Sequence, residues 1–563
     1  MNDDLSRRDF FRTGLKISGA VAASAVAGKF AGCSFRPREF DIIIMNGHII
    51  DGTGRPGFSG AVGIIGDTVA EVGNLQNDSA PVVIDAQSLI VAPGFINIHS
   101  HTGIGLLSGP EGMSSILQGV TTEVTGQDGS SAGPVAPDML DENRRRNSER
   151  YGFDRAFVNV GDFLDLMETG DIGINIASMV GQGTIRDVVV GQSDREASPE
   201  EIVQMRRLVK EGIEGGAVGL SSGLEYTPGS FAKTAEIAEI SRALKPFRLP
   251  YATHMRNEDN FLLEAIDETL TIGRDAECPV QISHLKVQGK PNWDKIDAVF
   301  EKIEQASDAR GDVHFDRYPY VAYSTGLSNL FPTWAREGGT ARFMERLQDG
   351  TLAARIREYV ENKVTDLGSW NAVMISRAGN DDDRGYAGMR MDEIARDRNT
   401  QPYDETVAML LRSRGSVGMV GFGMSEQNTE RILSHPLGMI CSDGSAMTVE
   451  GSGSPHPRSF GTFARVLGYY VRERKIFDLE TAVHKMTLMP AEKLRLKGRG
   501  VIGKGAYADI VVFDPAAMQD NATFSDPLQY ASGVSHVLVN GVIAVRGGSH
   551  TGALNGRVLR PGD

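Results

Sequence analysis

This sequence has few cysteines, and its positive charges are outnumbered by its negative ones. Its 563 residues include only three cysteines, Cys33, Cys278 and Cys441, so a disulfide framework cannot define the fold. The formal net charge is −15, which argues against a nucleic-acid partner, because binding phosphates requires clustered Lys and Arg. The chain does have 40% apolar residues and 66 glycines, which fits a globular α/β protein of more than one compact domain with many turns.

Residues 1–33 are predicted to be an export signal rather than part of the fold. Arg7 and Arg8 stand ahead of a weakly apolar stretch, which is typical of a twin-arginine (Tat) signal. That stretch is too short and too rich in Gly and Ala to predict a permanent membrane span. It ends in Phe30-Ala31-Gly32-Cys33, which resembles a lipoprotein processing site, although an ordinary cleaved signal fits as well. We expect Tat export, leaving the protein in the periplasm or membrane-anchored as a lipoprotein through lipid on Cys33.

Both ends of the remaining chain consist of short apolar runs separated by turn signals. Residues 40–92 include the turn Asn46-Gly47, and residues 500–563 include the strand pattern Ala508–Phe513 and the hairpin turn Asn540-Gly541. Because the two ends share this pattern, we predict that they join into one small β-sandwich domain.

Between these ends, in residues 93–499, apolar β-branched runs alternate with helical patterns. Such alternation predicts a parallel sheet, and eight repeats predict a (β/α)8, or TIM, barrel. More than one hundred residues separate the seventh and eighth strands, so we expect an inserted helical subdomain, about residues 325–420, that overhangs the barrel mouth. The eight predicted strands are Ile90–His101, Thr121–Gly126, Gly173–Gly181, Ala217–Gly223, Pro250–Met255, Pro279–Lys286, Asp312–Tyr320 and Gly438–Gly444.

Side chains that can bind a metal stand at the C-terminal ends of five of these strands. His99 and His101 end the first strand, and residues two apart on a strand share a face. Active sites of such barrels lie at this end, so all these side chains should converge on one site. Each of them alone is more often a surface, packing or turn residue, and the prediction depends on their joint occurrence. The other four are Asp128, His254, His284 and Asp443.

This set of imidazoles and carboxylates suits one or two Zn²⁺ or similar divalent ions. Such an ion lowers the pKa of a bound water from about 16 to near 7 and polarises a scissile carbonyl. A carboxylate must also take the proton of the water and pass it to the leaving nitrogen, and Asp443 can do so if it touches both metal and water. The sequence therefore predicts metal-dependent hydrolysis of an amide-type bond with Asp443 as the catalytic acid–base group.

Two stretches, Pro93–His101 and Gly505–Asp514, resemble the amidohydrolase superfamily. Within it the chain is similar to the N-acyl-D-amino-acid deacylases, or D-aminoacylases, over nearly everything from Phe40 to the C-terminus. The resemblance implies a small-molecule N-acyl amino acid as substrate, with release of a D-amino acid and a carboxylate. Its most specific stretches are Gly219–Tyr226, Ser283–Lys286, Tyr318–Tyr320, His456–Phe463 and Gly556–Pro561.

The resemblance also implies roles for individual residues. As metal ligands it implies His99, His101, His254, His284 and Asp443. As contacts to the substrate carboxylate it implies Tyr226, Lys286, Tyr318 and Arg458. These types fit, because Arg binds a carboxylate through a two-pronged fork, Lys adds a charge and Tyr adds a neutral donor. Structural salt bridges for the cations and core packing for the tyrosines are the alternatives.

The chain departs from the family at two places. Where relatives commonly carry a metal-binding Cys it has Asp128, whose two oxygens could bridge two ions. Thr102-Gly103 replaces residues that are usually acidic, so the lining should be less acidic. The fourth strand ends Ser221-Ser222-Gly223, without the carboxylated Lys of hydantoinase-like relatives, which argues against a cyclic-amide hydrolase. A dipeptidase or cyclic-amide hydrolase on the same barrel stays open, as does a lipoprotein that binds a ligand without turnover.

Overall fold

The computed structural model of the protein describes residues 38–451 and 453–562. The predicted export signal and Cys33 lie outside these ranges. None of the helices within the described ranges is both long enough and apolar enough to span a bilayer. The described residues from Glu39 onward belong to one compact unit.

Within the described ranges, eight parallel strands form the barrel, one of them interrupted at Met179. In chain order they are β6 (Phe95–Asn97), β7 (Val120–Thr125), β8 (Asn175–Ser178) with β9 (Val180–Gly181), β10 (Leu220–Gly223), β11 (Tyr251–His254), β12 (Val280–Ile282), β13 (Val313–Arg317) and β17 (Gly438–Ile440). Each pairs with its neighbours in sequence, and a parallel bridge between Ser100 and Gly444 joins the first strand to the last. The predicted (β/α)8 barrel is therefore confirmed.

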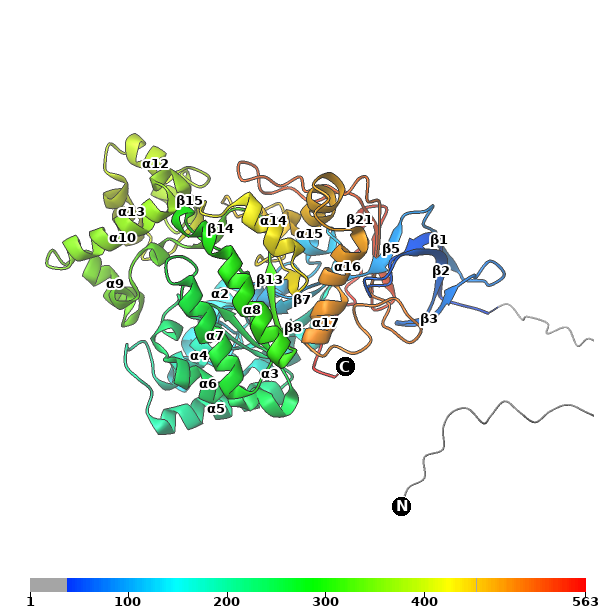
Figure 1. Ribbon diagram of the computed structural model, residues 1–563, viewed down its shortest axis with the longest axis horizontal. Coiled ribbons are helices and arrows are strands. Elements are labelled where there is room, and N and C mark those ends of the chain that lie inside the picture. Colours follow the sequence, from blue (N-terminus) through cyan, green and yellow to red (C-terminus); the bar gives the residue numbers. More distant parts are fainter. Residues whose placement is uncertain (1–37, 452, 563) are drawn as a thin grey trace, which may run out of the picture. The chain divides into compact units, whose positions relative to one another are not determined.

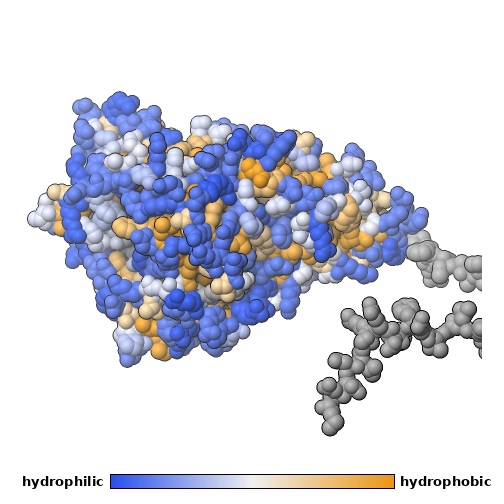
Figure 2. Space-filling view, viewed as in Figure 1, coloured by the Kyte–Doolittle hydropathy of each residue, from blue (hydrophilic) through white to orange (hydrophobic). Residues whose placement is uncertain are grey.

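Helices cover the outside of the barrel, so its strands are buried on both faces, as parallel strands usually are. The face in Figure 2 is accordingly mostly hydrophilic, with apolar residues in separate patches. The covering helices include α1 (Met113–Ile116), α3 (Val160–Thr169), α4 (Gln182–Val189), α5 (Pro199–Glu214), α6 (Thr234–Ser241), α7 (Leu262–Ala276), α8 (Ile296–Arg310), α14 (Glu426–Ser434), α15 (Arg458–Arg465), α16 (Leu479–Met486) and α17 (Leu488–Lys493). A further helix, α2 (Leu140–Tyr151), lies in the segment after β7.

Helix α5 illustrates how the sequence specifies these helices. The Ser198 hydroxyl accepts a hydrogen bond from the backbone N–H of Glu201 (3.2 Å), and the Glu201 carboxylate accepts one from the N–H of Ser198 (2.7 Å). This reciprocal cap satisfies backbone donors that have no partner inside the helix. The face toward the barrel repeats every four residues, at Met205, Val209 and Ile213, all buried.

Strands from both chain ends form one nine-stranded sheet, which confirms that the two ends join. From the N-terminal end come β1 (Ile42–Ile49), β2 (Phe58–Ile65), β3 (Thr68–Gly73), β4 (Val82–Asp85) and β5 (Ile90–Pro93), and from the C-terminal end β18 (Ile510–Phe513), β19 (Val534–Val539), β20 (Val542–Arg546) and β21 (Ser549–His550). Strand β5 joins the halves, because it pairs with both β1 and β18.

The predicted first strand, Ile90–His101, is wrong as a single strand, because Gly94 divides it between two sheets. Ile90–Pro93 belongs to the nine-stranded sheet, and only the part from Phe95 onward belongs to the barrel. A Cβ at Gly94 would lie 2.3 Å from the side chain of Thr121, so only glycine allows the chain to pass this closely.

Between β13 and β17 the chain inserts a subdomain, as predicted, and we call residues 323–421 the insertion. It holds an antiparallel sheet as well as the expected helices. Its elements are β14 (Tyr323–Gly326), α9 (Gly339–Leu347), α10 (Ala353–Leu367), β15 (Val373–Ala378), α11 (Asp381–Arg384), α12 (Met391–Asp397), α13 (Pro402–Arg412) and β16 (Val417–Gly421). In Figure 1 the helices of the insertion gather at the upper left, away from β1, β2 and β3.

Candidate metal centre and active site

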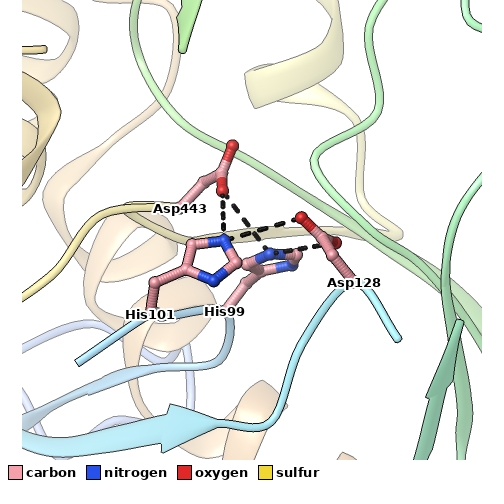
Figure 3. A group of neighbouring side chains, drawn as sticks. All are labelled: His99, His101, Asp128 and Asp443. Atoms are coloured by element: carbon pink, nitrogen blue, oxygen red, sulfur yellow. Dashed lines mark hydrogen bonds and ion pairs between the residues drawn. The ribbon is translucent and has the colours of Figure 1, made fainter. Parts of the chain in front are cut away.

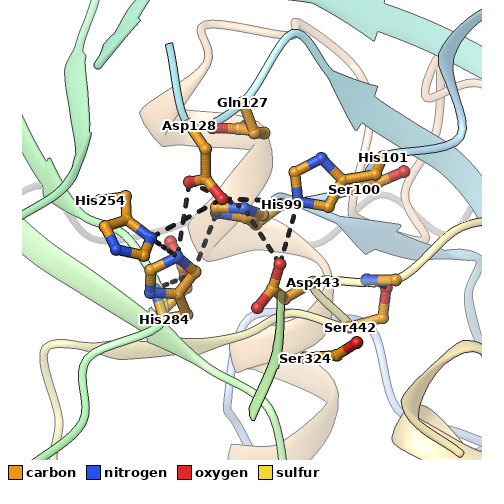
Figure 4. Close-up of polar contacts among 12 residues, drawn as sticks. His99, Ser100, His101, Gln127, Asp128, His254, His284, Ser324, Ser442 and Asp443 are labelled. Atoms are coloured by element: carbon orange, nitrogen blue, oxygen red, sulfur yellow. Dashed lines mark hydrogen bonds and ion pairs between the residues drawn. The ribbon is translucent and has the colours of Figure 1, made fainter. Parts of the chain in front are cut away.

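All six residues predicted as metal ligands converge at the C-terminal ends of the barrel strands (Figure 4). They lie at or just beyond the ends of β6, β7, β11, β12 and β17, as the strand pattern predicts. Their side chains point toward one another across the mouth of the barrel. The residues are His99, His101, Asp128, His254, His284 and Asp443.

Four of these residues form one candidate metal group (Figure 3). The Nε2 atom of His101 lies 3.0 Å from Oδ1 of Asp443 and 3.5 Å from Oδ2 of Asp128. The Nε2 atom of His99 lies 3.6 Å from the same Asp443 oxygen and 3.4 Å from Oδ1 of Asp128. One ligand atom from each of the four lies within 4.8 Å of the others, a spacing that a single divalent ion can occupy.

Asp128 also belongs to a second candidate group, with His254 and His284. Nδ1 of His254 lies 3.1 Å from Nε2 of His284 and 3.8 Å from Oδ2 of Asp128. Nε2 of His284 lies 3.4 Å from Oδ1 of Asp128. Because one carboxylate faces both groups, the arrangement can hold two ions that share Asp128.

Three site residues adopt the left-handed backbone conformation: Asp128 (φ 53°), His284 (φ 37°) and Asp443 (φ 50°). For a residue other than glycine this costs on the order of 1–3 kcal/mol and occurs mostly where the surroundings enforce it. Here the N–H of His284 donates to Asp316 (2.7 Å), and the N–H of Asp443 donates to the carbonyl of His99 (3.0 Å). The strained backbone thus turns all three side chains into the barrel mouth.

Negative charge dominates the electrostatics of the two groups. Burial would lower the pKa of His101, but Asp128 and Asp443 outweigh it and raise that pKa to about 9. The pKa of His284 rises to about 10, because the neighbouring carboxylates outweigh burial and the charge of Lys286. Burial would raise the pKa of Asp443, yet Arg458 and the histidines hold it well below its usual range. The negative potential that raises the pKa of these imidazoles would also favour the binding of a cation.

Several polar atoms of the two metal groups have no hydrogen-bond partner among the described residues. They include both ring nitrogens of His99 and Oδ1 of Asp128, all fully buried. Leaving a buried polar atom unsatisfied costs about 1–3 kcal/mol, so such atoms are few in folded proteins and cluster where a ligand binds. A divalent cation would satisfy these atoms together.

Three of the four predicted substrate contacts, Tyr226, Lys286 and Arg458, line a cavity of ≈ 290 Å³ beside the metal groups. Both cations are paired with acids: Lys286 with Glu258 (2.6 Å) and Arg458 with Asp443 (2.5 Å). The insertion supplies much of the remaining lining: Tyr323, Ser324, Thr325, Asn329, Leu330, Lys363 and Met419.

The fourth predicted contact, Tyr318, does not line this cavity. Its hydroxyl is fully buried and has no partner among the described residues. Its ring lies behind the two cations, 5.9 Å from Nζ of Lys286 and 5.1 Å from the guanidinium carbon of Arg458. That geometry supports the two cations from behind. A direct contact between Tyr318 and a substrate stays a prediction.

The sequence prediction missed four acidic or basic residues of the site: Glu225, Glu258, Asp316 and Lys363. Asp316 accepts hydrogen bonds from the backbone of His284 and, at 2.7 Å, from the side chain of Gln281. Glu225 stands next to Tyr226 in a stretch singled out for its resemblance to the family, so its position was the available signal. Lys363 reaches the site from α10, and no motif near it in the sequence signals this.

Comparison with known proteins agrees with this geometry. A family model described as "Amidohydrolase family" matches residues 82–356 and 431–545. A D-aminoacylase from Alcaligenes xylosoxydans xylosoxydans is 38% identical over 529 residues, covering 93% of this chain and 98% of that protein. A solved D-aminoacylase structure with a binuclear metal center aligns with a TM-score of 0.77 at 37% identity, over 92% of this chain and 100% of that one.

A second solved structure is a complex with an inhibitor. It is the N-acyl-D-glutamate deacylase from Bordetella bronchiseptica, complexed with zinc and a phosphonate inhibitor that mimics the tetrahedral intermediate of the reaction. It aligns with a TM-score of 0.78 at 30% identity, over 93% of this chain and 100% of that one. The chain therefore belongs to the amidohydrolase family, and within it to the N-acyl-D-amino-acid deacylases.

Proposed function

We propose that this protein is a zinc-dependent deacylase that hydrolyses N-acyl-D-amino acids to a D-amino acid and a carboxylate. The observation that carries the proposal is the pair of candidate metal groups that share Asp128 and contain the unsatisfied polar atoms of His99 and Asp128. The deacylase activity and the D configuration rest on the relatives, which cover nearly the whole chain.

The donor set fits Zn²⁺, which binds imidazole nitrogens and carboxylate oxygens. One ion would be held by His99, His101 and Asp443, and the other by His254 and His284. Both groups would share Asp128. When bound, a divalent cation polarises the scissile carbonyl and makes water a better nucleophile near neutral pH.

Asp443 is the residue that moves the proton. Its pKa is held well below the usual range, so the carboxylate is ionised at neutral pH. Oδ1 faces His101 at 3.0 Å, and Oδ2 accepts a hydrogen bond from Arg458 at 2.5 Å, which fixes the carboxylate. From this position it can take a proton from the attacking water and give it to the leaving nitrogen, which departs as a neutral amine.

Arg458, Lys286 and Tyr226 hold the carboxylate of the substrate. All three line the same cavity as Asp443, beside the metal groups. Burial and nearby carboxylates raise the pKa of Tyr226 well above its usual value, so its hydroxyl stays protonated and can donate a hydrogen bond. Two cations and one neutral donor form a site for a single carboxylate.

A hydrolysis screen tests the proposed function. N-acetyl D- and L-amino acids and dipeptides are incubated with zinc-loaded protein and with protein treated with a chelator. We expect turnover of N-acetyl-D-amino acids only, loss of turnover with the chelator and recovery on adding zinc. Turnover that survives complete metal removal, or a preference for L-amino acids or dipeptides, would reject the proposal.

We also propose export by the Tat route, with the mature protein in the periplasm or lipid-anchored at Cys33. The support is the Arg7-Arg8 pair ahead of an apolar stretch that ends in Ala31-Gly32-Cys33. Replacing both arginines by lysine should retain the protein in the cytoplasm, and Cys33→Ser should abolish lipid labelling without blocking export. Unchanged export of the double lysine variant would contradict the Tat assignment.

A further inference from the structure

We propose that Glu225 is a positioning residue that orients His254 for metal binding, and that the insertion holds Glu225 in place. The inference rests on the proposed metal-dependent function and adds a residue to it. Glu225 follows β10 in the loop Leu224-Glu225-Tyr226, and its side chain lines the cavity beside the metal groups.

The two ring nitrogens of His254 face opposite surroundings. Nδ1 points to the second metal group, 3.1 Å from His284 and 3.8 Å from Asp128. Nε2 points away from that group, 3.4 Å from Oε2 of Glu225. A carboxylate on this side favours the tautomer with a proton on Nε2, which leaves the Nδ1 lone pair free for a cation.

A second carboxylate, that of Glu258, also faces His254 but is farther away and otherwise engaged. Its Oε2 lies 3.8 Å from Nε2 of His254 and accepts a hydrogen bond from Gln288 (2.7 Å). Its Oε1 is paired with Lys286 at 2.6 Å and lies 3.3 Å from Nδ1 of His284. Glu258 therefore serves His284 and Lys286, whereas Glu225 is the nearer partner of His254.

Three contacts from the insertion fix the loop that carries Glu225. Arg336 donates a hydrogen bond to the backbone carbonyl of Glu225 at 2.8 Å. The ammonium of Lys363 lies 3.9 Å from Oε1 of Glu225, within ion-pair distance. The hydroxyls of Tyr226 and Thr325 lie 3.3 Å apart. One oxygen of Glu225 thus faces the insertion and the other faces Nε2 of His254.

Metal affinity tests this role more directly than activity does. Zinc dissociation constants are measured by competition with a chromogenic chelator for the wild type, Glu225→Gln and Glu225→Ala. The matched control is Glu214→Gln, an exposed acid on α5 that pairs with Lys210 at 2.5 Å. Absorption spectra of the cobalt-loaded proteins report the ligand geometry independently, and thermal melting shows whether each variant is folded.

We expect Glu225→Ala to weaken the binding of one ion by about 10- to 100-fold, the usual effect of removing a carboxylate behind a ligating histidine. Glu225→Gln keeps an acceptor but loses the charge, so it should fall between Glu225→Ala and the wild type. The cobalt spectrum should change in both variants and stay unchanged in Glu214→Gln.

Two results would overturn the inference. If Glu225→Ala binds zinc as tightly as the wild type and keeps its cobalt spectrum while KM rises, Glu225 contacts the substrate and does not position His254. If the wild type itself binds no zinc, the proposed metal-dependent function fails and the inference fails with it. The first result leaves the proposed function intact, so the two failures are distinguishable.

Discussion

Two clusters of buried polar side chains lie at opposite ends of the barrel strands and differ in how completely their atoms are hydrogen-bonded. One lies where β8 begins, around Asp509, which accepts from Asn175 (3.0 Å), from Arg499 and from the N–H of Asn540 (2.7 Å). Asn540 in turn donates to Asn175 (2.8 Å) and accepts from Arg499 (2.8 Å). This cluster ties the C-terminal end of the chain to the barrel.

The other cluster is the metal centre at the C-terminal strand ends, and its atoms are incompletely satisfied. His99 and Asp128 keep buried atoms without hydrogen bonds, and three of its members have a strained backbone. Two clusters of similar burial and polarity thus serve opposite purposes. Complete hydrogen bonding indicates a structural role, whereas unsatisfied atoms and strain indicate a place prepared for a ligand.

The largest predicted effect is on catalysis at the metal centre. Asp443→Asn keeps the shape of the side chain and an acceptor for Arg458 but removes the base. We expect kcat to fall by about 10²–10⁴-fold, the contribution typical of a general acid–base group. Steady-state kinetics with zinc-loaded protein measure this, and thermal melting should show little change.

A matched control is Asp520→Asn, which alters a half-buried Arg–Asp pair, with Arg465 at 3.0 Å, away from the metal groups. Its kcat should stay near that of the wild type. Equal losses of kcat in the two variants would mean that these acids matter only for folding. The contrast between the metal centre and the cluster around Asp509 would then disappear.

The second prediction applies to the structural cluster. Asp509→Ala leaves Arg499 buried without its carboxylate, and breaking a buried pair in this way costs about 3–5 kcal/mol. We expect the free energy of unfolding, measured with denaturant, to fall by this amount, while kcat per folded, zinc-loaded molecule stays unchanged. A variant with normal stability and impaired turnover would reverse the assignment of roles.

The third prediction concerns pH and a buried cation far from the metal groups. Lys485 on α16 donates to backbone carbonyls of His435 and Gly438, and burial lowers its pKa to about 7. Unfolded lysine has a pKa of about 10.4, so between these values only the unfolded chain holds the proton, and this group's contribution to stability rises with pH. Below pH 7 both states are protonated, and the cost of the buried charge is constant.

Lys485→Met removes that titration. The gain in free energy of unfolding of Lys485→Met over the wild type should be largest below pH 7. This gain should decrease between pH 7 and about pH 10, by at most about 1.4 kcal/mol per pH unit. Denaturant unfolding at pH 6, 8 and 9.5 measures the difference. A difference that is flat from pH 6 to 9.5 would show that Lys485 stays charged in the folded protein, with a pKa near that of the unfolded chain.

How much the sequence could predict differs between the two sides of the active site. The metal side follows from strand periodicity, because the ends of parallel strands meet at one edge, and His99, His254 and His284 stand at such ends. The position of Asp128 between two groups was expected because it replaces the metal-binding cysteine of the family, whereas the backbone strain at His284 depends on packing that no local pattern encodes.

The side formed by the insertion could not be predicted in the same way. Lys363 lies on α10, and only the folded path of the insertion brings it to Glu225. The split of the first strand at Gly94 was missed for a different reason. The dipeptide Pro93-Gly94, a common turn signal, was the available sign of the break. The contact with Thr121, which explains why glycine is required there, is visible only in the folded chain.

The smallest predicted effect is on the substrate side, at the hydroxyl of Tyr226. Tyr226→Phe keeps the ring that lies 4.7 Å from that of His254 and removes one neutral donor, worth about 0.5–1.5 kcal/mol. We expect kcat/KM for an N-acetyl-D-amino acid to fall by about 2- to 12-fold, mostly through KM, with zinc affinity unchanged. The control is Tyr386→Phe, whose hydroxyl binds Asp397 on the surface of the insertion. If Tyr226→Phe lowers zinc affinity instead, the contact between Tyr226 and Thr325 must stabilise the metal group by holding the neighbouring Glu225. Substrate binding and metal binding would then depend on the same residues.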